Sequence, residues 1–487
     1  MFNNSTSKSI INTFLYQIVT KGIGYVKYLL FAFIFGLSLE MDAYNMALTI
    51  LDVSMFVLGH TFSVVGVPQL VKAREKSLLS FKKLCGSIFI FSLVLAVFLI
   101  PLQYVFFENL ISILAPGFTE EKMEYSKDIF NYFLPMSIVY LPYFALMSFF
   151  RALNLFSISN VLEFIIAIIS FIYLILFMNK GIHIIPLSLD FAYIISFTFA
   201  VYFAIKIRVI GFYGSLNTQF MRKIYKNILK LSLWFLILQL YRVVDKGFAS
   251  LLEDGMISAL IYASMIISSF TFIFDFAYVY LTKFSQKNDK AKLFTIAIRL
   301  YLFLSLPIMV FLVFYSYEFM DIVFGHGVFS QKAVEITASI IMITSPLIFF
   351  GLANGLFQSL YQSIDKYNYI IILSFIGISI NFGLNYILID DYGIYGIAFA
   401  TMVSTLIIFM INIFLLYIKE NIKIGYKSVL IDMLMISIFA IFSISIGKYF
   451  ITNIYFGVTV SIIIYIILLV IVKNEFYIKI YNIIRKK

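Results

Sequence analysis

The chain has 487 residues, of which 62% are hydrophobic and 13% are charged, and its formal net charge is +11. Soluble domains contain about 45 to 50% apolar and about 25% charged residues, so the composition excludes a soluble protein and predicts an all-α polytopic membrane protein. The basic residues are spread over many short segments, which favours contact with anionic lipid head groups over nucleic-acid binding. The one cysteine, Cys85, excludes an internal disulfide.

Apolar segments long enough to cross the hydrocarbon core, about 20 residues each, recur along the whole chain. No segment between them is long enough for a soluble domain, so function must reside in the helical bundle or at its mouths. We expect fourteen membrane spans, at residues 10–36, 43–71, 85–107, 128–150, 158–178, 185–205, 229–252, 257–281, 294–316, 333–355, 369–389, 394–418, 427–449 and 456–472.

An internal repeat indicates how the spans are grouped. The segment that begins at Ala115 resembles the one that begins at Phe324, because each has a glycine-containing loop followed by a helix with a proline, Pro135 or Pro346. Six spans separate the copies, so both have the same orientation, as in parallel repeats about an axis along the membrane normal. The predicted parts are a six-helix lobe (1–206), a second six-helix lobe related to it by a pseudo-two-fold axis (207–422), and two additional helices with a tail (423–487).

Four cationic side chains lie inside predicted spans: Lys21, Lys27, Arg242 and Lys246. Each costs about 2.5 to 3.5 kcal/mol at the centre of a bilayer, and such residues usually face a water-filled cavity on a substrate path. Asp52 and Asp245 reduce the charge of the set without cancelling it. A cationic cavity of this kind suits an anionic substrate such as a diphosphate, which Lys and Arg bind through charge-assisted hydrogen bonds.

The same charges have a purely structural alternative. Lys27 with Asp52, and Arg242 or Lys246 with Asp245, would then be buried ion pairs that fix helix packing. Four isolated groups are expected to be satisfied inside the bundle or at its interfaces: His60, Glu163, Asp190 and Asp275.

The segment GIGYVKYLLFAFIFGLSLEMDAYNMALTI resembles the first-helix signature of MurJ (MviN-type) lipid II flippases. That signature is a Gly-Phe-x-Arg-Asp run, then Ile-Phe-Gly, then an Asp-Ala pair, and the matching positions here are Gly24, Lys27, Ile34-Phe35-Gly36 and Asp42-Ala43. Further similar stretches are APGF from Ala115, FASLLEDGMISALIYA from Phe248, FGHGVFS from Phe324 and GIYGIAFAT from Gly393. The resemblance implies fourteen helices in two lobes, with a final pair that lines a groove for a lipid tail, and membership of the multidrug, oligosaccharidyl-lipid and polysaccharide exporter superfamily.

The resemblance also implies roles for individual residues. Basic residues of the family's first helix hold the diphosphate of the substrate and match Lys21 and Lys27, while an acidic residue before helix 2 matches Asp42. The chain departs from the family at ILDVSMF, where Asp52 stands in a stretch that carries arginines in the family, and at Tyr262-Ala263-Ser264-Met265, where an arginine is replaced. The candidate substrate-binding residues are therefore Lys21, Lys27, Asp42, Asp52, Arg242 and Lys246, the last two as possible replacements for the missing arginines.

These observations predict a flippase that moves a polyprenyl-diphosphate-linked glycan, lipid II or a related peptidoglycan precursor, from the inner to the outer leaflet of a bacterial plasma membrane by alternating access. Most basic residues fall in alternate loops, which places both termini in the cytoplasm. No catalytic residue, metal or cofactor is expected. The sequence has no G-x-x-x-x-G-K-[ST] run and does not choose between a coupling ion and the membrane potential as the energy source. The oligomeric state is not specified.

Three alternatives stay open. A flippase for O-antigen or capsule oligosaccharides would share the architecture. A cation-coupled multidrug exporter would share it as well but would need an acidic cavity. A membrane glycosyltransferase would need carboxylates at an aqueous face, and the outer loops that carry acidic pairs, Glu120-Glu121, Glu253-Asp254 and Asp390-Asp391, are short.

The predicted topology can be tested by cysteine labelling in a Cys85→Ala background. Cysteines introduced at Thr119 and Lys332 should react with an impermeant thiol reagent added to intact cells, because both positions lie in predicted outer loops. Cysteines at Lys82 and Lys290 should react after permeabilisation alone. The reverse labelling pattern would contradict the orientation.

Overall fold

The computed structural model describes residues 4–209, 219–286, 289–451 and 454–471, and these residues form helices joined by short turns. The helices are α1 (Asn4–Phe35), α2 (Leu39–Leu51), a π-helical turn η1 (Asp52–Phe56), α3 (Val57–Lys76), α4 (Leu78–Val105), α5 (Phe107–Leu114), α6 (Glu120–Asn131), α7 (Leu134–Ala152), α8 (Phe156–Phe177), α9 (Ile184–Lys206), α10 (Gln219–Ala249), α11 (Met256–Phe274), α12 (Ala277–Gln286), α13 (Lys290–Phe324), α14 (Gln331–Thr344), α15 (Leu347–Ser363), α16 (Tyr367–Ile418), α17 (Tyr426–Phe450) and α18 (Ile454–Ile471).

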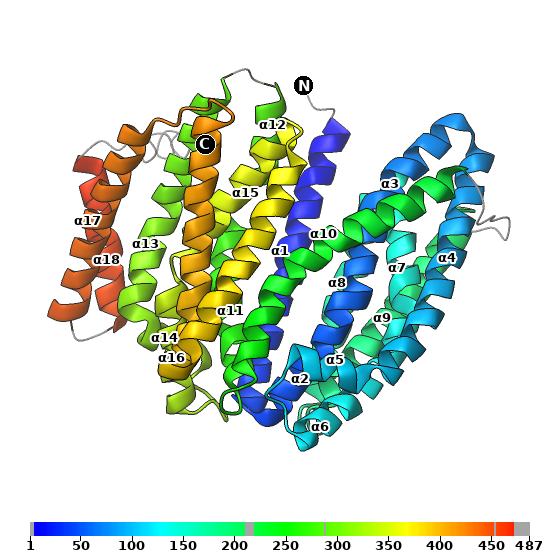
Figure 1. Ribbon diagram of the computed structural model, residues 1–487, viewed down its shortest axis with the longest axis horizontal. Helices are drawn as coiled ribbons and strands as arrows, with labels where there is room; N and C mark the ends of the chain where they lie inside the picture. Colours follow the sequence, from blue (N-terminus) through cyan, green and yellow to red (C-terminus); the bar gives the residue numbers. More distant parts are fainter. Residues whose placement is uncertain (1–3, 210–218, 287–288, 452–453, 472–487) are drawn as a thin grey trace. The chain divides into compact units, whose positions relative to one another are not determined.

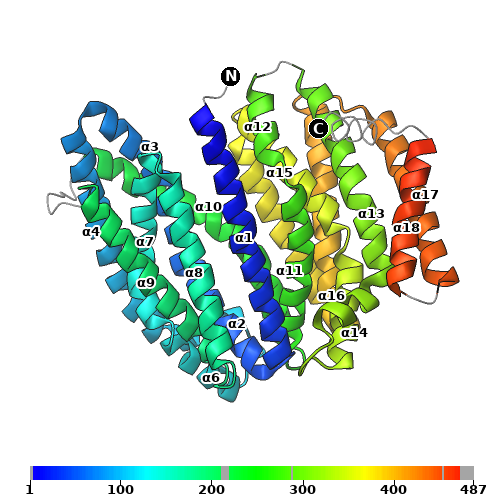
Figure 2. The same ribbon diagram turned by 180° about the vertical axis from the view of Figure 1, so that it is seen from behind.

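Contacts divide the chain into two compact units, residues 1–258 and 259–487. In the first unit α7 is central: most of its residues are buried, and it packs against α3, α4 and α9 (Figure 1 and, from behind, Figure 2). In the second unit α15 packs in a similar way against α12, α13 and α16. The described residues between 207 and 258 pack with the first unit. The lobe boundaries expected from the sequence remain predictions.

The two copies of the sequence repeat have the same local structure. In each, a hydroxyl side chain caps a short helix: Thr119 accepts from the backbone N–H of Lys122 in α6, and Ser330 accepts from that of Ala333 in α14. A proline then lies at the start of the longer second helix, α7 or α15, where its missing N–H has no helical partner to lose. Because α7 and α15 are the central helices of their units, the repeat identifies the core of each.

The number of spans differs from the sequence-based expectation of fourteen. Within the described residues, eleven helices are long and apolar enough to cross a membrane, or twelve if α14 and α15, bent by 44° at their break, are one span. The final helix is shorter, with a described apolar stretch of Tyr455–Ile471. The count of fourteen is therefore not confirmed, whereas the all-helical membrane architecture is.

One source of the difference is α16, a 52-residue element that covers two expected spans. The amide Nδ2 of Asn381 donates to the hydroxyl of Thr401 at 3.1 Å, although 20 residues of straight helix would separate them by about 30 Å. The chain must therefore reverse between them. The reversal coincides with Gly393, whose φ of 52° and ψ of −130° interrupt the helix.

Gly393 should tolerate no side chain, because its backbone conformation is strained for L-residues by about 1 to 3 kcal/mol. Gly393→Ala is expected to lower the thermal midpoint of the detergent-solubilised protein. Gly383→Ala is the matched control: its added methyl group meets no atom within 4 Å, and alanine favours helix by up to about 1 kcal/mol. Equal midpoints for the two variants would contradict a reversal at Gly393.

Candidate substrate site

Three of the six candidate residues, Asp52, Arg242 and Lys246, come together in the first unit. Asp52 begins the π-helical turn η1 and lies within electrostatic range of Lys246 and Arg242, which are one turn apart on α10. The ammonium of Lys246 donates to the hydroxyl of Thr49 at 2.7 Å. We call Asp52, Arg242, Lys246 and Thr49 the α10 cation cluster, and its formal charge is positive.

The backbone at Asp52 is π-helical instead of α-helical. Residues Asp52–Phe56 form a single π-helical turn between α2 and α3 inside one apolar stretch, Leu39–Lys76. Such turns insert a residue into an α-helix and occur often at functional sites, because they redirect side chains that regular helix would bury. The turn is held by the amide of Gln103 on α4, which donates to the hydroxyl of Ser54.

The exposure of Arg242 indicates where water reaches the cluster. Its side chain is exposed and donates to the amide oxygen of Gln239, while Lys246 and Asp52 are half-buried. An exposed guanidinium facing lipid would be costly, so this surface must face water or another polar group. Lys246 is in the last turn of α10, where the negative end of the helix dipole offsets part of its charge.

The two candidate cations of α1 lie apart from each other on that helix. The ammonium of Lys27 donates to the hydroxyl of Ser170 on α8 at 2.9 Å, and Lys21 is exposed. The expected alternative pairing of Lys27 with Asp52 is therefore not what the structure shows, since Asp52 faces the α10 cations. The phenol of Tyr28, next to Lys27, is within electrostatic range of Asp52 and Arg242, so α1 borders the α10 cation cluster.

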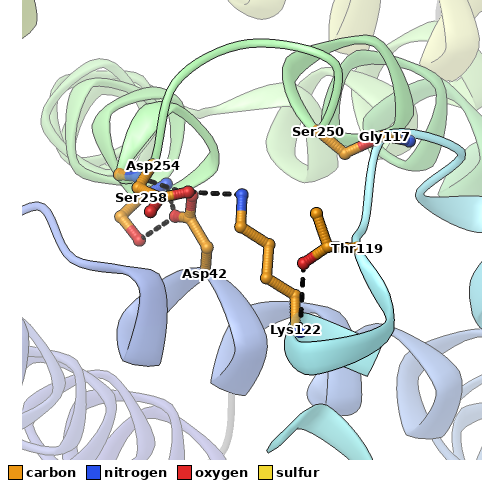
Figure 3. A network of polar contacts seen from close by, with 8 residues as sticks. Asp42, Gly117, Thr119, Lys122, Ser250, Asp254 and Ser258 are labelled. Atoms are coloured by element: carbon orange, nitrogen blue, oxygen red, sulfur yellow. Dashed lines mark hydrogen bonds and ion pairs between the residues drawn. The ribbon is translucent and has the colours of Figure 1, made fainter. Parts of the chain in front are cut away.

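Asp42 has a different environment from the other candidates. It is 3% exposed, and both of its carboxylate oxygens accept hydrogen bonds: Oδ2 from the backbone N–H of Gly255 at 2.7 Å, and Oδ1 from the N–H and hydroxyl of Ser258 at 2.8 and 2.6 Å (Figure 3). The carboxylate thus serves the free N–H groups at the start of α11, where the helix dipole favours an anion. In this conformation Asp42 holds the start of α2 against the start of α11, and this is what we call its fastening role. A direct contact between Asp42 and the substrate remains a prediction.

A second set of contacts surrounds Asp42. Lys122 of α6 forms an ion pair with Asp254, and the N–H of Gly117 donates to the hydroxyl of Ser250 at 3.1 Å (Figure 3). A Cβ at Gly117 would lie 2.1 Å from the carbonyl oxygen of Ser250, so the close approach requires glycine. Three stretches that carry the sequence resemblance, those with Asp42, Gly117 and Ser250, therefore meet at one point.

Most isolated polar groups have the structural roles expected for them. Glu163 accepts from Arg151 at 3.0 Å, Asp190 from the N–H of Met136 at 3.0 Å, and Asp275 from the N–H of Ala277 at 2.8 Å. His60 is exposed beside the ring of Phe144.

Comparison with known proteins places these features in one family. The family model described as lipid II flippase MurJ matches residues 31–470, which is most of the chain. The chain belongs to the MurJ lipid II flippase family. It is therefore a multi-pass membrane protein, and the resemblance inferred from its motifs is confirmed.

Individual relatives agree with this assignment. A probable lipid II flippase MurJ of Aquifex aeolicus (strain VF5) is 26% identical over 410 residues, covering 80% of this chain and 79% of the relative. That of Borreliella burgdorferi (strain ATCC 35210 / DSM 4680 / CIP 102532 / B31) is 23% identical over 468 residues, covering 90% and 89%.

Solved structures show the shared fold. A lipid II flippase MurJ in an inward closed conformation is similar with a TM-score of 0.84 and 22% identity, covering 96% of this chain and 99% of that one. An inward-facing multidrug resistance MATE family transporter of the MOP superfamily has a TM-score of 0.63 and 12% identity, covering 79% and 92%. The expected superfamily architecture is thus confirmed at the level of fold.

Sequence reasoning missed the neutral partners of the charged residues. Thr49, Ser170 and Ser258 supply hydroxyl groups to Lys246, Lys27 and Asp42, respectively. Each stands in an apolar span, where a lone hydroxyl is unremarkable because serine and threonine also bond to their own helix backbone. Nothing in the spacing distinguishes those that contact a charge on another helix.

The Asp42 contacts give a stability prediction. Asp42→Ala should destabilise the protein by roughly 1.5 to 3 kcal/mol, because hydrogen bonds to a buried charge are lost and N–H groups are left unpaired. Asp254→Ala removes a carboxylate that is half exposed and should cost about 0 to 1 kcal/mol. Thermal unfolding in detergent measures both, and similar losses for the two variants would contradict the fastening role.

Proposed function

We propose that this protein translocates lipid II, or a closely related polyprenyl-diphosphate-linked peptidoglycan precursor, from the inner to the outer leaflet of the bacterial plasma membrane. The observation that carries the proposal is the match of residues 31–470 to the lipid II flippase family, together with cationic side chains inside the apolar spans. The protein acts as a transporter and not as an enzyme, with both termini in the cytoplasm.

The chemistry of the site supports a diphosphate ligand. Lys27 and Lys246 are held by neutral hydroxyl groups of Ser170 and Thr49, so those hydrogen bonds leave their charge uncancelled. The guanidinium of Arg242 is exposed on the same unit. Phosphate oxygens form short charge-assisted hydrogen bonds with such groups, and a polyprenyl tail remains in the lipid while the head group crosses.

The second candidate function is transport of a polyprenyl-diphosphate that carries a different glycan. Asp52 stands where the family resemblance leads one to expect arginines, and it faces Lys246 and Arg242. A carboxylate in this position reduces the positive charge available to the substrate and adds an acceptor for sugar hydroxyl groups. This departure from the family pattern supports an O-antigen or capsule-type lipid-linked oligosaccharide as the alternative substrate. Such a lipid has the same diphosphate as lipid II and differs from it in the sugars.

The test is translocation of fluorescent lipid II by the purified protein in proteoliposomes. The double variant Lys27→Ala/Arg242→Ala should lower the rate at least about tenfold, since each lost charged hydrogen bond is worth about 1.5 to 3 kcal/mol. Lys180→Ala/Lys206→Ala is the matched control, because it removes two exposed cations at helix ends and should leave transport unchanged. Normal transport by the first variant would refute the cationic site, and faster transport of an O-antigen-type substrate by the intact chain would select the second candidate.

A further inference from the structure

A second basic site lies at the opposite ends of the helices that carry the α10 cation cluster. The end of α3 and the beginning of α10 enclose a hollow of about 350 Å³, lined by Gln69, Lys72, Glu75, Lys76, Gln219 and Lys223. Along α3, Lys72 is about 30 Å from Asp52 at 1.5 Å per residue, which is the thickness of the hydrocarbon core. The hollow is therefore separate from the α10 cation cluster and lies at the end of the apolar stretch Leu39–Lys76, where a spanning helix leaves the hydrocarbon core.

The residues that line this hollow carry more positive than negative charge. Three lysines face one carboxylate, that of Glu75. Within the described part of the chain, neither Lys72 nor Lys223 has an acidic side chain within ion-pair distance. The site is thus an acceptor for negative charge.

Gln69 adds an observation that is independent of charge. It lines the hollow, and its amide nitrogen and oxygen are not among the buried polar atoms of the described segments that lack a partner, so the amide is accessible from the hollow. An accessible amide in the lining of a basic hollow suits the oxygen atoms of a phosphate ester, to which its NH2 group would donate.

We propose that this hollow binds the phosphate ester of a membrane lipid, as a site separate from the one that carries the substrate across. Its volume is within the range of small-ligand sites, about 300 to 1,000 Å³, and is large enough for one head group. Its position at the ends of two spanning helices favours a phosphate carried by a lipid over a soluble anion. Two lipids supply that chemistry: an anionic phospholipid, or the lipid-linked diphosphate before it enters the bundle.

The experiment measures lipid binding to the full chain in phosphatidylcholine nanodiscs doped with either phosphatidylglycerol or a polyprenyl diphosphate. Lys72→Gln/Lys223→Gln should weaken binding of one or both lipids at least tenfold. Lys82→Gln/Lys83→Gln removes the same charge from the nearby start of α4, outside the hollow, and should leave binding unchanged. The lipid whose affinity falls identifies the source of the phosphate.

A second variant separates the hollow from general surface charge. Gln69→Leu keeps the size and the charge of the site but removes the amide, and it should weaken the same lipid severalfold. Equal losses in the two double variants, no loss in Gln69→Leu, or no preference for either doped lipid over phosphatidylcholine would each overturn the proposal. Because binding is measured without transport, these outcomes are independent of whether the protein flips lipid II.

Discussion

The cost of leaving a charged or polar group without a partner in the bilayer underlies the organisation of this protein. Hydrocarbon offers no hydrogen bonds, so backbone groups are paired within helices and each buried charge has to find a partner in the chain or in water. Asp42, Lys27 and Lys246 meet this requirement in different ways. Both carboxylate oxygens of Asp42 accept hydrogen bonds from groups of the chain. The two lysines donate to neutral hydroxyl groups, and these hydrogen bonds do not neutralise their charge.

This difference separates fastening residues from residues available to a substrate. The Asp42 contacts join the start of α2 to the segment between α10 and α11, at the point where Gly117 and Ser250 also approach closely. The α10 cation cluster lies further along the same helices. A cationic site that can accept a ligand, next to a structural contact made of several hydrogen bonds, suits a transporter. Substrate binding can then change the first without breaking the second.

The departure from the family's pattern in helix 2 has a structural counterpart. Asp52 is the first residue of the π-helical turn, and it faces the cations of α10 across the first unit. In this protein the apolar stretch that contains helix 2 carries a carboxylate, and two cations of α10 lie within electrostatic range of it. The carboxylate lowers the positive charge of the α10 cation cluster and adds a hydrogen-bond acceptor to it.

The sequence by itself determined the membrane class, the approximate positions of most spans, the repeat and the family, because hydrophobicity and motif spacing are local properties of the chain. It also identified Asp52, Arg242 and Lys246 as exceptional, since charges in apolar spans are expensive. Only the tertiary structure decided which charges meet. It brings Asp52 within electrostatic range of the α10 cations and Lys27 into contact with Ser170, uses Asp42 to hold the start of α11, and reverses Tyr367–Ile418 at Gly393. These outcomes depend on helix rotation and on neutral serine and threonine partners, neither of which spacing along the chain specifies.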